Sequence, residues 1–339
     1  MNAWSATAPR FALNSLDNLT HSLVGWSLGQ AGLKTKSRKG LAALILGANM
    51  PDIDVFLGHA PWDPLAIHRG FTHGLVGGVL FLPPVLAGLL WLLDRWQLSR
   101  LVAFKSGLPM RFGWLVLLAF LGTLTHPFLD LLTTYSVQLF SPLSSAWYHS
   151  DALFIIDIWV WLLLAIAIGI SKRREQKGLE WRRIPQAAIA IVIAYIGANL
   201  AISQAAYVNV LAADPRAEAI FASPPPVLSW RRDMVWRDGP DYCRASYDPL
   251  GSGFRLGSCV PANMGNPLVR EAIRRDPGLQ KFLKWSILPQ ADVTEERCAV
   301  RVAIGDARYG EGRRSRLARE SVIPAPGNRC SLDKSSTNS

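Results

Sequence analysis

Apolar positions form long unbroken runs in the first 210 residues, and a more polar sequence with short apolar stretches follows them. Four runs are long enough to cross a bilayer as helices, which rise about 1.5 Å per residue. They span residues 71–93, 113–135, 153–170 and 187–208. The pattern predicts an α-helical polytopic membrane domain over residues 1–210 and a soluble domain over residues 211–339.

Two shorter apolar runs, at residues 16–33 and 40–50, precede the four spans. The second stops at Pro51, which ends a helix because proline has no backbone N–H to donate. We expect a helical hairpin packed against the main spans, and a pair of re-entrant segments is the alternative. Pro83 and Pro84 are expected to kink the first span.

The sequence beyond residue 210 alternates short apolar stretches with glycine and proline turns, which predicts a small mixed α/β domain. All four cysteines lie there, and none forms the CxxC pair of a zinc ribbon. Their even number indicates two disulfides and an oxidising compartment, with four buried thiols as the alternative. The pairing is open among Cys243, Cys259, Cys298 and Cys330.

The net charge of +11 does not predict nucleic-acid binding, because much of it lies in Lys/Arg clusters beside the apolar runs. Such clusters mark the cytoplasmic loops of membrane proteins. They occur at residues 34–39, 95–111 and 172–183, whereas the loop 136–152 has no lysine or arginine. We therefore expect a multi-pass protein whose soluble domain lies outside the cytoplasm, where disulfides form.

Histidines and carboxylates also occur within the apolar runs, where each costs about 2.5–3.5 kcal/mol to insert and indicates function by default. His126 and Asp130 are four residues apart, so they share a helix face and either chelate a cation or hydrogen-bond each other. His68 and His73 flank the start of the first span.

Two further motifs precede that span. Asp52 and Asp54 follow a helix-ending proline, a pattern that suits either a cation or an Asx-turn. His21 comes one turn after Asp17 and Asn18, either of which can cap a helix.

The predicted topology puts all of these side chains near the outer ends of their helices. Imidazole and carboxylate ligands suit a centre of one or two divalent cations, zinc or else manganese. The candidate ligands are His21, Asp52, Asp54, His68, His73, His126 and Asp130.

The same segments resemble the motifs of a known family. They read DNLTHSL at 17–23, PDID at 51–54, HRGFTH at 68–73 and THPFLD at 125–130. In this order they resemble the YdjM-type family of bacterial inner-membrane proteins. The resemblance implies an inner-membrane location, a metal site built from the seven candidate ligands, and hydrolytic activity.

The hypothesis is therefore a membrane-bound, metal-dependent hydrolase. Asp52 or Asp54 could act as general base, and Arg69 could stabilise an anionic group, although a headgroup-facing arginine is the alternative. A site at the membrane surface favours a phosphate ester of a lipid or another amphiphile as substrate. The residues expected to orient the ligands are His149, Asp151 and Asp157.

Two other functions fit the same residues. A transporter, or a metal or proton pathway, needs polar residues through both leaflets, and the inner halves of the spans are apolar. A non-catalytic adaptor would hold a structural metal whose ligand positions are all filled, whereas a catalytic centre keeps one open. No pattern in the sequence specifies an oligomeric state.

Overall fold

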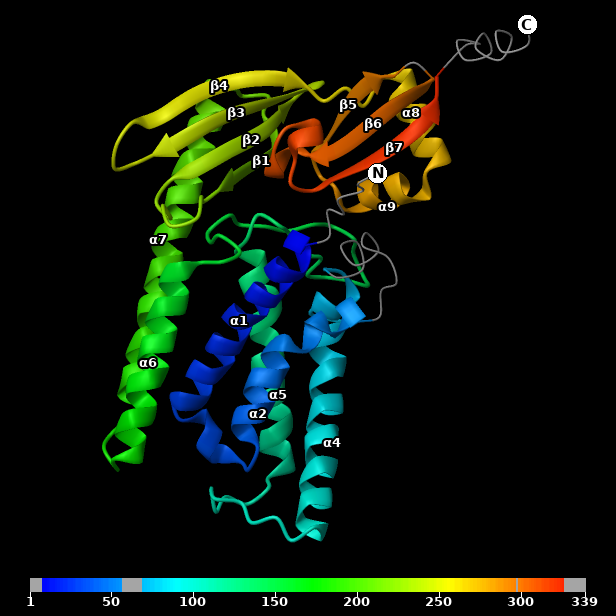
Figure 1. The fold of residues 1–339 in the computed structure, drawn as a ribbon. Helices are drawn as coiled ribbons and strands as arrows, with labels where there is room; N and C mark the ends of the chain where they lie inside the picture. The colour runs from blue at the N-terminus through cyan, green and yellow to red at the C-terminus, as the bar shows by residue number, and fades with distance from the viewer. Residues whose placement is uncertain (1–7, 57–68, 297, 326–339) are drawn as a thin grey trace, which may run out of the picture. The chain divides into compact units, whose positions relative to one another are not determined.

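A computed structural model describes residues 8–56, 69–296 and 298–325 of the chain (Figure 1). Contacts within the chain divide it into two compact units. Among the described residues, the first unit holds 8–56, 69–203 and 223–230, and the second holds the remainder.

The first unit is helical. Its elements are α1 (Ala8–Gln30), η1 (Leu33–Lys36), α2 (Gly40–Asn49), η2 (Met50–Phe56), η3 (Phe71–His73), α4 (Gly78–Ser99), α5 (Phe112–Leu131), α6 (Ile158–Gln176) and most of α7 (Arg183–Ala213). Here η marks a short 3₁₀ helix.

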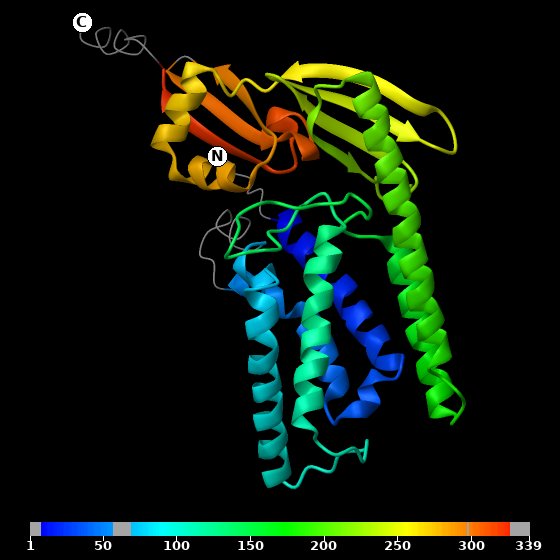
Figure 2. The same ribbon diagram turned by 180° about the vertical axis from the view of Figure 1, so that it is seen from behind.

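The expected helical hairpin is formed by α1 and α2, and α2 packs against both α1 and α5 (Figure 2). Glycines make the contact between α2 and α5 close. A Cβ at Gly47 or at Gly122 would lie within 3.0 Å of a carbonyl oxygen of the facing helix, closer than real Cβ atoms approach. Small residues let membrane helices approach in this way. The C-terminal end of α2 is therefore held directly against α5.

Among the described residues, three helices are long and apolar enough to cross a membrane, namely α4, α5 and α7. The fourth expected span, at 153–170, is not confirmed. α6 begins only at Ile158, because Asp157 caps it by accepting hydrogen bonds from the backbone of Trp159 and Val160. Its last turn is charged, so its apolar part is about 21 Å long, and it matches the roughly 30 Å hydrocarbon core only when the long basic side chains of its last turn extend to the membrane surface.

The first of the expected spans starts later than its hydropathy indicated. The segment Phe71–His73 forms a separate 3₁₀ turn, and α4 begins only at Gly78. Gly77 and Gly78 lie against the carbonyl groups of this turn, where a Cβ would not fit. The two prolines lie in the second turn of α4 without ending it.

The boundaries of two further helices also differ from expectation. α5 ends at Leu131, four residues before the expected end. α1 begins at Ala8, so Asp17 and Asn18 lie within the helix and do not cap it.

The second unit is rich in β-structure. A four-stranded sheet has the order β1-β2-β3-β4, and a three-stranded sheet has the order β5-β6-β7. The elements are β1 (Glu218–Ser223), β2 (Arg232–Asp238), β3 (Asp241–Asp248), β4 (Gly253–Pro261), α8 (Pro267–Arg275), α9 (Pro277–Trp285), β5 (Pro289–Glu295), β6 (Ala299–Asp306) and β7 (Ala318–Pro324).

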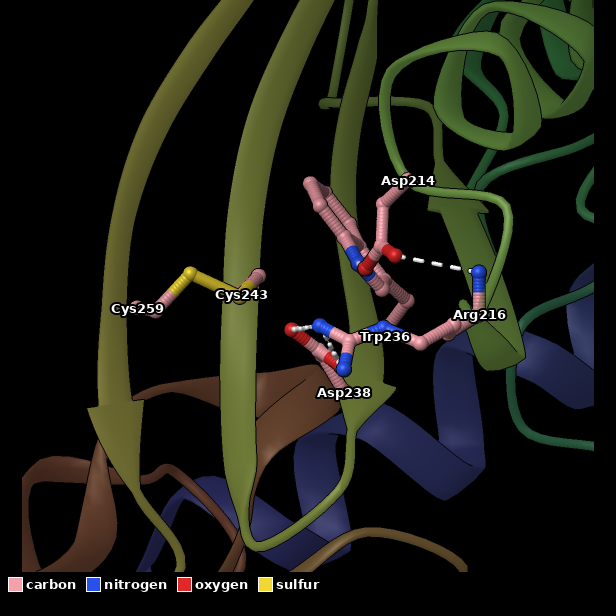
Figure 3. Close-up of a disulfide and its surroundings, with 6 residues drawn as sticks. All are labelled: Asp214, Arg216, Trp236, Asp238, Cys243 and Cys259. Atoms are coloured by element: carbon pink, nitrogen blue, oxygen red, sulfur yellow. Dashed lines mark hydrogen bonds and ion pairs between the residues drawn. A yellow bond between two sulfur atoms is a disulfide. The ribbon is translucent and has the colours of Figure 1, made fainter.

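A disulfide joins Cys243 on β3 to Cys259, the residue opposite it on β4 (Figure 3). β4 is an edge strand whose residues are mostly exposed, so this bond ties a poorly buried strand to the sheet. Cys298 is also disulfide-bonded, which agrees with the expected oxidised state. Cys330 lies outside the described residues.

The close contact between α2 and α5 yields a prediction. Gly122→Ala should lower the free energy of unfolding by about 1–3 kcal/mol, because the added methyl group meets the Leu44 carbonyl oxygen. The measurement is thermal unfolding of the purified chain in detergent. Gly113→Ala on the same helix is the control, since a Cβ there meets nothing within 4 Å. Equal effects of the two substitutions would contradict the packing described.

Candidate metal centre

Four segments of the first unit bring histidine and aspartate side chains together. His21 comes from α1, Asp52 from η2, His73 from η3, and His126 and Asp130 from α5. The last two lie one helical turn apart and so share a face. η2 follows α2 directly, so the helix held against α5 by glycines delivers its aspartates to the same place.

Three ligand atoms form a nearly equilateral triangle. The Nε2 atoms of His73 and His126 are 3.1 Å apart, and Asp52 Oδ1 lies 3.3 Å from the first and 3.2 Å from the second. Four ligands at about 2.0–2.1 Å around a tetrahedral zinc ion are separated from each other by about 3.3–3.4 Å. The spacing therefore suits ligands that share one cation.

Asp130 approaches the same two nitrogens. Its Oδ2 lies 3.4 Å from His73 Nε2 and 3.6 Å from His126 Nε2. This oxygen is buried and accepts no hydrogen bond from the described residues. The side chain of Asp52 is 11% exposed, whereas those of the other three groups are at most 2% exposed. The cluster thus opens to its surroundings at Asp52.

Each of the two imidazole rings has a hydrogen-bond partner at Nδ1, on the side away from the triangle. The Nδ1 atom of His126 lies 2.6 Å from the Ala48 carbonyl oxygen, which can only accept, so Nδ1 carries a proton and the neutral ring presents the lone pair of Nε2. His73 Nδ1 lies 3.1 Å from the Thr72 hydroxyl, and that hydroxyl donates to Asp54. Such partners fix the tautomer of a metal-binding histidine.

Asp54 is consequently placed on the far side of His73. Its Oδ2 lies 4.0 Å from His73 Nδ1, the nitrogen that points away from the triangle. This position suits a group that orients His73 better than a ligand of the same cation. Thr72, which links the two residues, was not a candidate in the sequence analysis, although it stands next to His73 in the motif.

His21 lies beside the triangle. Its ring stacks on that of His126, with centroids 3.7 Å apart, and its Nε2 lies 4.0 Å from Asp130 Oδ1. His21, His126 and Asp130 form a second group that could hold a metal ion, next to the group of Asp52, His73 and His126.

Arg69 is buried beside this second group. Its Nη2 lies 3.2 Å from Asp130 Oδ1, and its Nη1 lies 3.5 Å from the Thr133 hydroxyl. Its guanidinium also stacks over the Tyr135 ring, 5.4 Å from the centroid. Arg69 therefore forms an ion pair with Asp130, and its expected role of stabilising an anionic group of a substrate stays a prediction.

The other candidates from the sequence have contacts of their own. Asp157 caps α6 and accepts a hydrogen bond from Tyr195 on α7, so it holds those two helices together. His149 Nδ1 lies 3.0 Å from Asp151 Oδ1 in the loop after α5. His68 lies outside the described residues.

Three observations indicate that these histidine and aspartate side chains suit a divalent cation. Two histidine nitrogens face each other at a distance typical of shared ligation, and a carbonyl holds one of them in the binding tautomer. A buried carboxylate oxygen beside them lacks a hydrogen bond from the described residues. Such a group is costly to bury unless a cation or another donor satisfies it.

Comparisons with known proteins identify the family of the chain. The sequence matches the model of the YdjM inner membrane protein family over residues 16–206, which is more than half of the chain and includes all four segments of the cluster. No curated protein and no solved structure matches the chain. The chain therefore belongs to the YdjM inner membrane protein family.

Proposed function

We propose that the chain is a membrane-bound hydrolase that uses a divalent cation, zinc or manganese, to cleave a phosphate ester of a lipid or another amphiphile. One observation carries the proposal: the Nε2 atoms of two histidines lie 3.1–3.6 Å from each other and from the carboxylate oxygens of two aspartates. These residues are His73, His126, Asp52 and Asp130. Three of these groups are fully buried and one is partly open, which is the pattern expected of a centre that admits a substrate.

Each residue has a separate task in this proposal. His73, His126 and Asp130 hold the cation, since two imidazoles and a carboxylate are a common catalytic set that leaves a position open. The bound cation supplies Lewis-acid chemistry, lowering the pKa of a water molecule and stabilising charge on the attacked oxygen. Asp52 lies in the same triangle, but as the most exposed of the four groups it is assigned here to the water and not to the cation, and it takes the proton from the attacking water as general base. Asp54 acts only through Thr72 and His73.

The placement of the centre on α5 supports a lipid or amphiphile as substrate. α5 is a candidate span, and His126 and Asp130 lie in its last two turns, just before it ends at Leu131. A span of about 30 Å ends at the level of the lipid headgroups, where phosphate esters lie.

The alternative of a transport pathway is disfavoured by the packing below the centre. The helices α2, α4 and α5 meet there in an apolar cluster built from alanine and leucine side chains. The buried carboxylate at the other end of α4, Asp94, is paired with Arg38 at 2.8 Å. A polar pathway would need hydratable groups between these two places.

We also propose that the second unit lies outside the cytoplasm. Two independent features support this. Disulfides such as Cys243–Cys259 persist in oxidising compartments, and the Lys/Arg clusters lie at the opposite ends of the apolar helices.

The proposed chemistry predicts different outcomes for two variants. Asp52→Asn should lower kcat for hydrolysis of long-chain phosphate esters in mixed micelles by about 10²–10⁴-fold with metal retained, because only the general base is lost. His126→Ala should lose both metal and activity. Phosphate release and elemental analysis of the purified chain measure the two properties.

Asp157→Asn serves as the matched control, because it changes a buried carboxylate of the same unit that caps α6. It should retain metal and activity. A wild-type protein that binds metal but hydrolyses no phosphate ester would favour the adaptor instead.

The proposed topology predicts the behaviour of fusions. Alkaline phosphatase folds only in an oxidising compartment, so a fusion after residue 325 should be active in bacteria and one after Lys105 inactive. Activity is measured in whole cells, with fusion protein levels compared by immunoblot. The reverse pattern would place the second unit in the cytoplasm.

A further inference from the structure

We propose that the centre holds a single divalent cation and that the guanidinium of Arg69 occupies the place of a second one. The inference rests on the proposed function and concerns the number of ions, which the two candidate metal-binding groups leave open.

The two oxygens of Asp130 face different partners. Oδ2 lies 3.4 Å from His73 Nε2 and 3.6 Å from His126 Nε2, within the set of atoms that suits one cation. Oδ1 lies 3.2 Å from Arg69 Nη2 and 4.0 Å from His21 Nε2. A carboxylate that bridges two metal ions would present one oxygen to each of them. Here the second oxygen is given to an arginine.

His126 cannot serve both candidate groups. It belongs to each of them, but the bond from Nδ1 to the Ala48 carbonyl leaves Nε2 as its single ligand atom. That atom lies in the triangle with His73 and Asp52. A second ion would therefore rely on His21 and on Asp130 Oδ1, which already faces Arg69.

The charges of the described site residues also balance with one ion. Asp52, Asp54 and Asp130 contribute three negative charges and Arg69 one positive charge, which leaves a net charge of −2 with neutral histidines. One divalent cation neutralises this charge, whereas a second would leave two positive charges in a buried site. Uncompensated buried charge is strongly unfavourable.

Arg69 is held firmly in this place. The Thr133 hydroxyl and the Tyr135 ring contact its guanidinium, and its carbonyl oxygen accepts a hydrogen bond from the backbone of Gln138. It is a positioning residue, because it acts on the cation through Asp130. His21 is then a packing partner of His126 and not a ligand in the wild-type protein.

The test is the number of zinc ions per chain in full-length protein in detergent, stripped with chelator, reloaded with zinc chloride and freed of unbound metal. Wild type and Arg69→Lys should each bind one equivalent. Arg69→Met, which keeps an unbranched apolar stem but removes the guanidinium and its charge, should bind two. The added equivalent should disappear again in Arg69→Met combined with His21→Ala.

The single variant His21→Ala is a second test, which does not depend on whether Arg69→Met folds. It should still bind one equivalent, and a loss of that zinc would contradict the inference. Two equivalents in wild type, or one in folded Arg69→Met, would also overturn it. Failure of the wild type to bind zinc or manganese would instead overturn the proposed function.

Discussion

Three carboxylates of the first unit, Asp52, Asp54 and Asp130, lie together at the end of an apolar helix bundle, and their charge has to be balanced within a few ångströms. Arg69 balances one of them through its ion pair with Asp130. The remaining charge faces two imidazole nitrogens that lie 3.1 Å apart. A divalent cation satisfies the carboxylates and the imidazoles together, and the arrangement of the surrounding elements serves this requirement.

The helix packing shows how the cluster is built. Glycines at the contact of α2 and α5 bring the Ala48 carbonyl within hydrogen-bond distance of His126, and the turn that follows α2 then carries Asp52 to the same nitrogen. The orientation of a ligand on one helix thus depends on the backbone of another. Small residues at that contact let the two helices pack closely, and the close packing in turn orients His126.

The i, i+4 spacing of His126 and Asp130 and the apolar runs were enough to predict the shared helix face, the hairpin and three of the four spans. The order of the motifs predicted the family. The role of Asp54 depends on which nitrogen of His73 it approaches. Thr72 and the 3₁₀ turn Phe71–His73 determine this, and hydropathy did not distinguish that turn from the helix that follows it. Sequence proximity could not reveal that Arg69 pairs with Asp130, because the two are distant in the chain and meet only by folding. Asp157 stands within an apolar run, and because it caps α6, that helix begins later than hydropathy indicated.

X-ray absorption at the zinc edge of the reloaded wild-type protein tests the central claim most directly, because it reports the ligand atoms without requiring a substrate. The account predicts two imidazoles and additional oxygen ligands at about 2.0–2.2 Å, with no sulfur and no second metal nearby. One imidazole or none, or a sulfur shell at about 2.3 Å, would contradict a centre built from His73, His126 and Asp130.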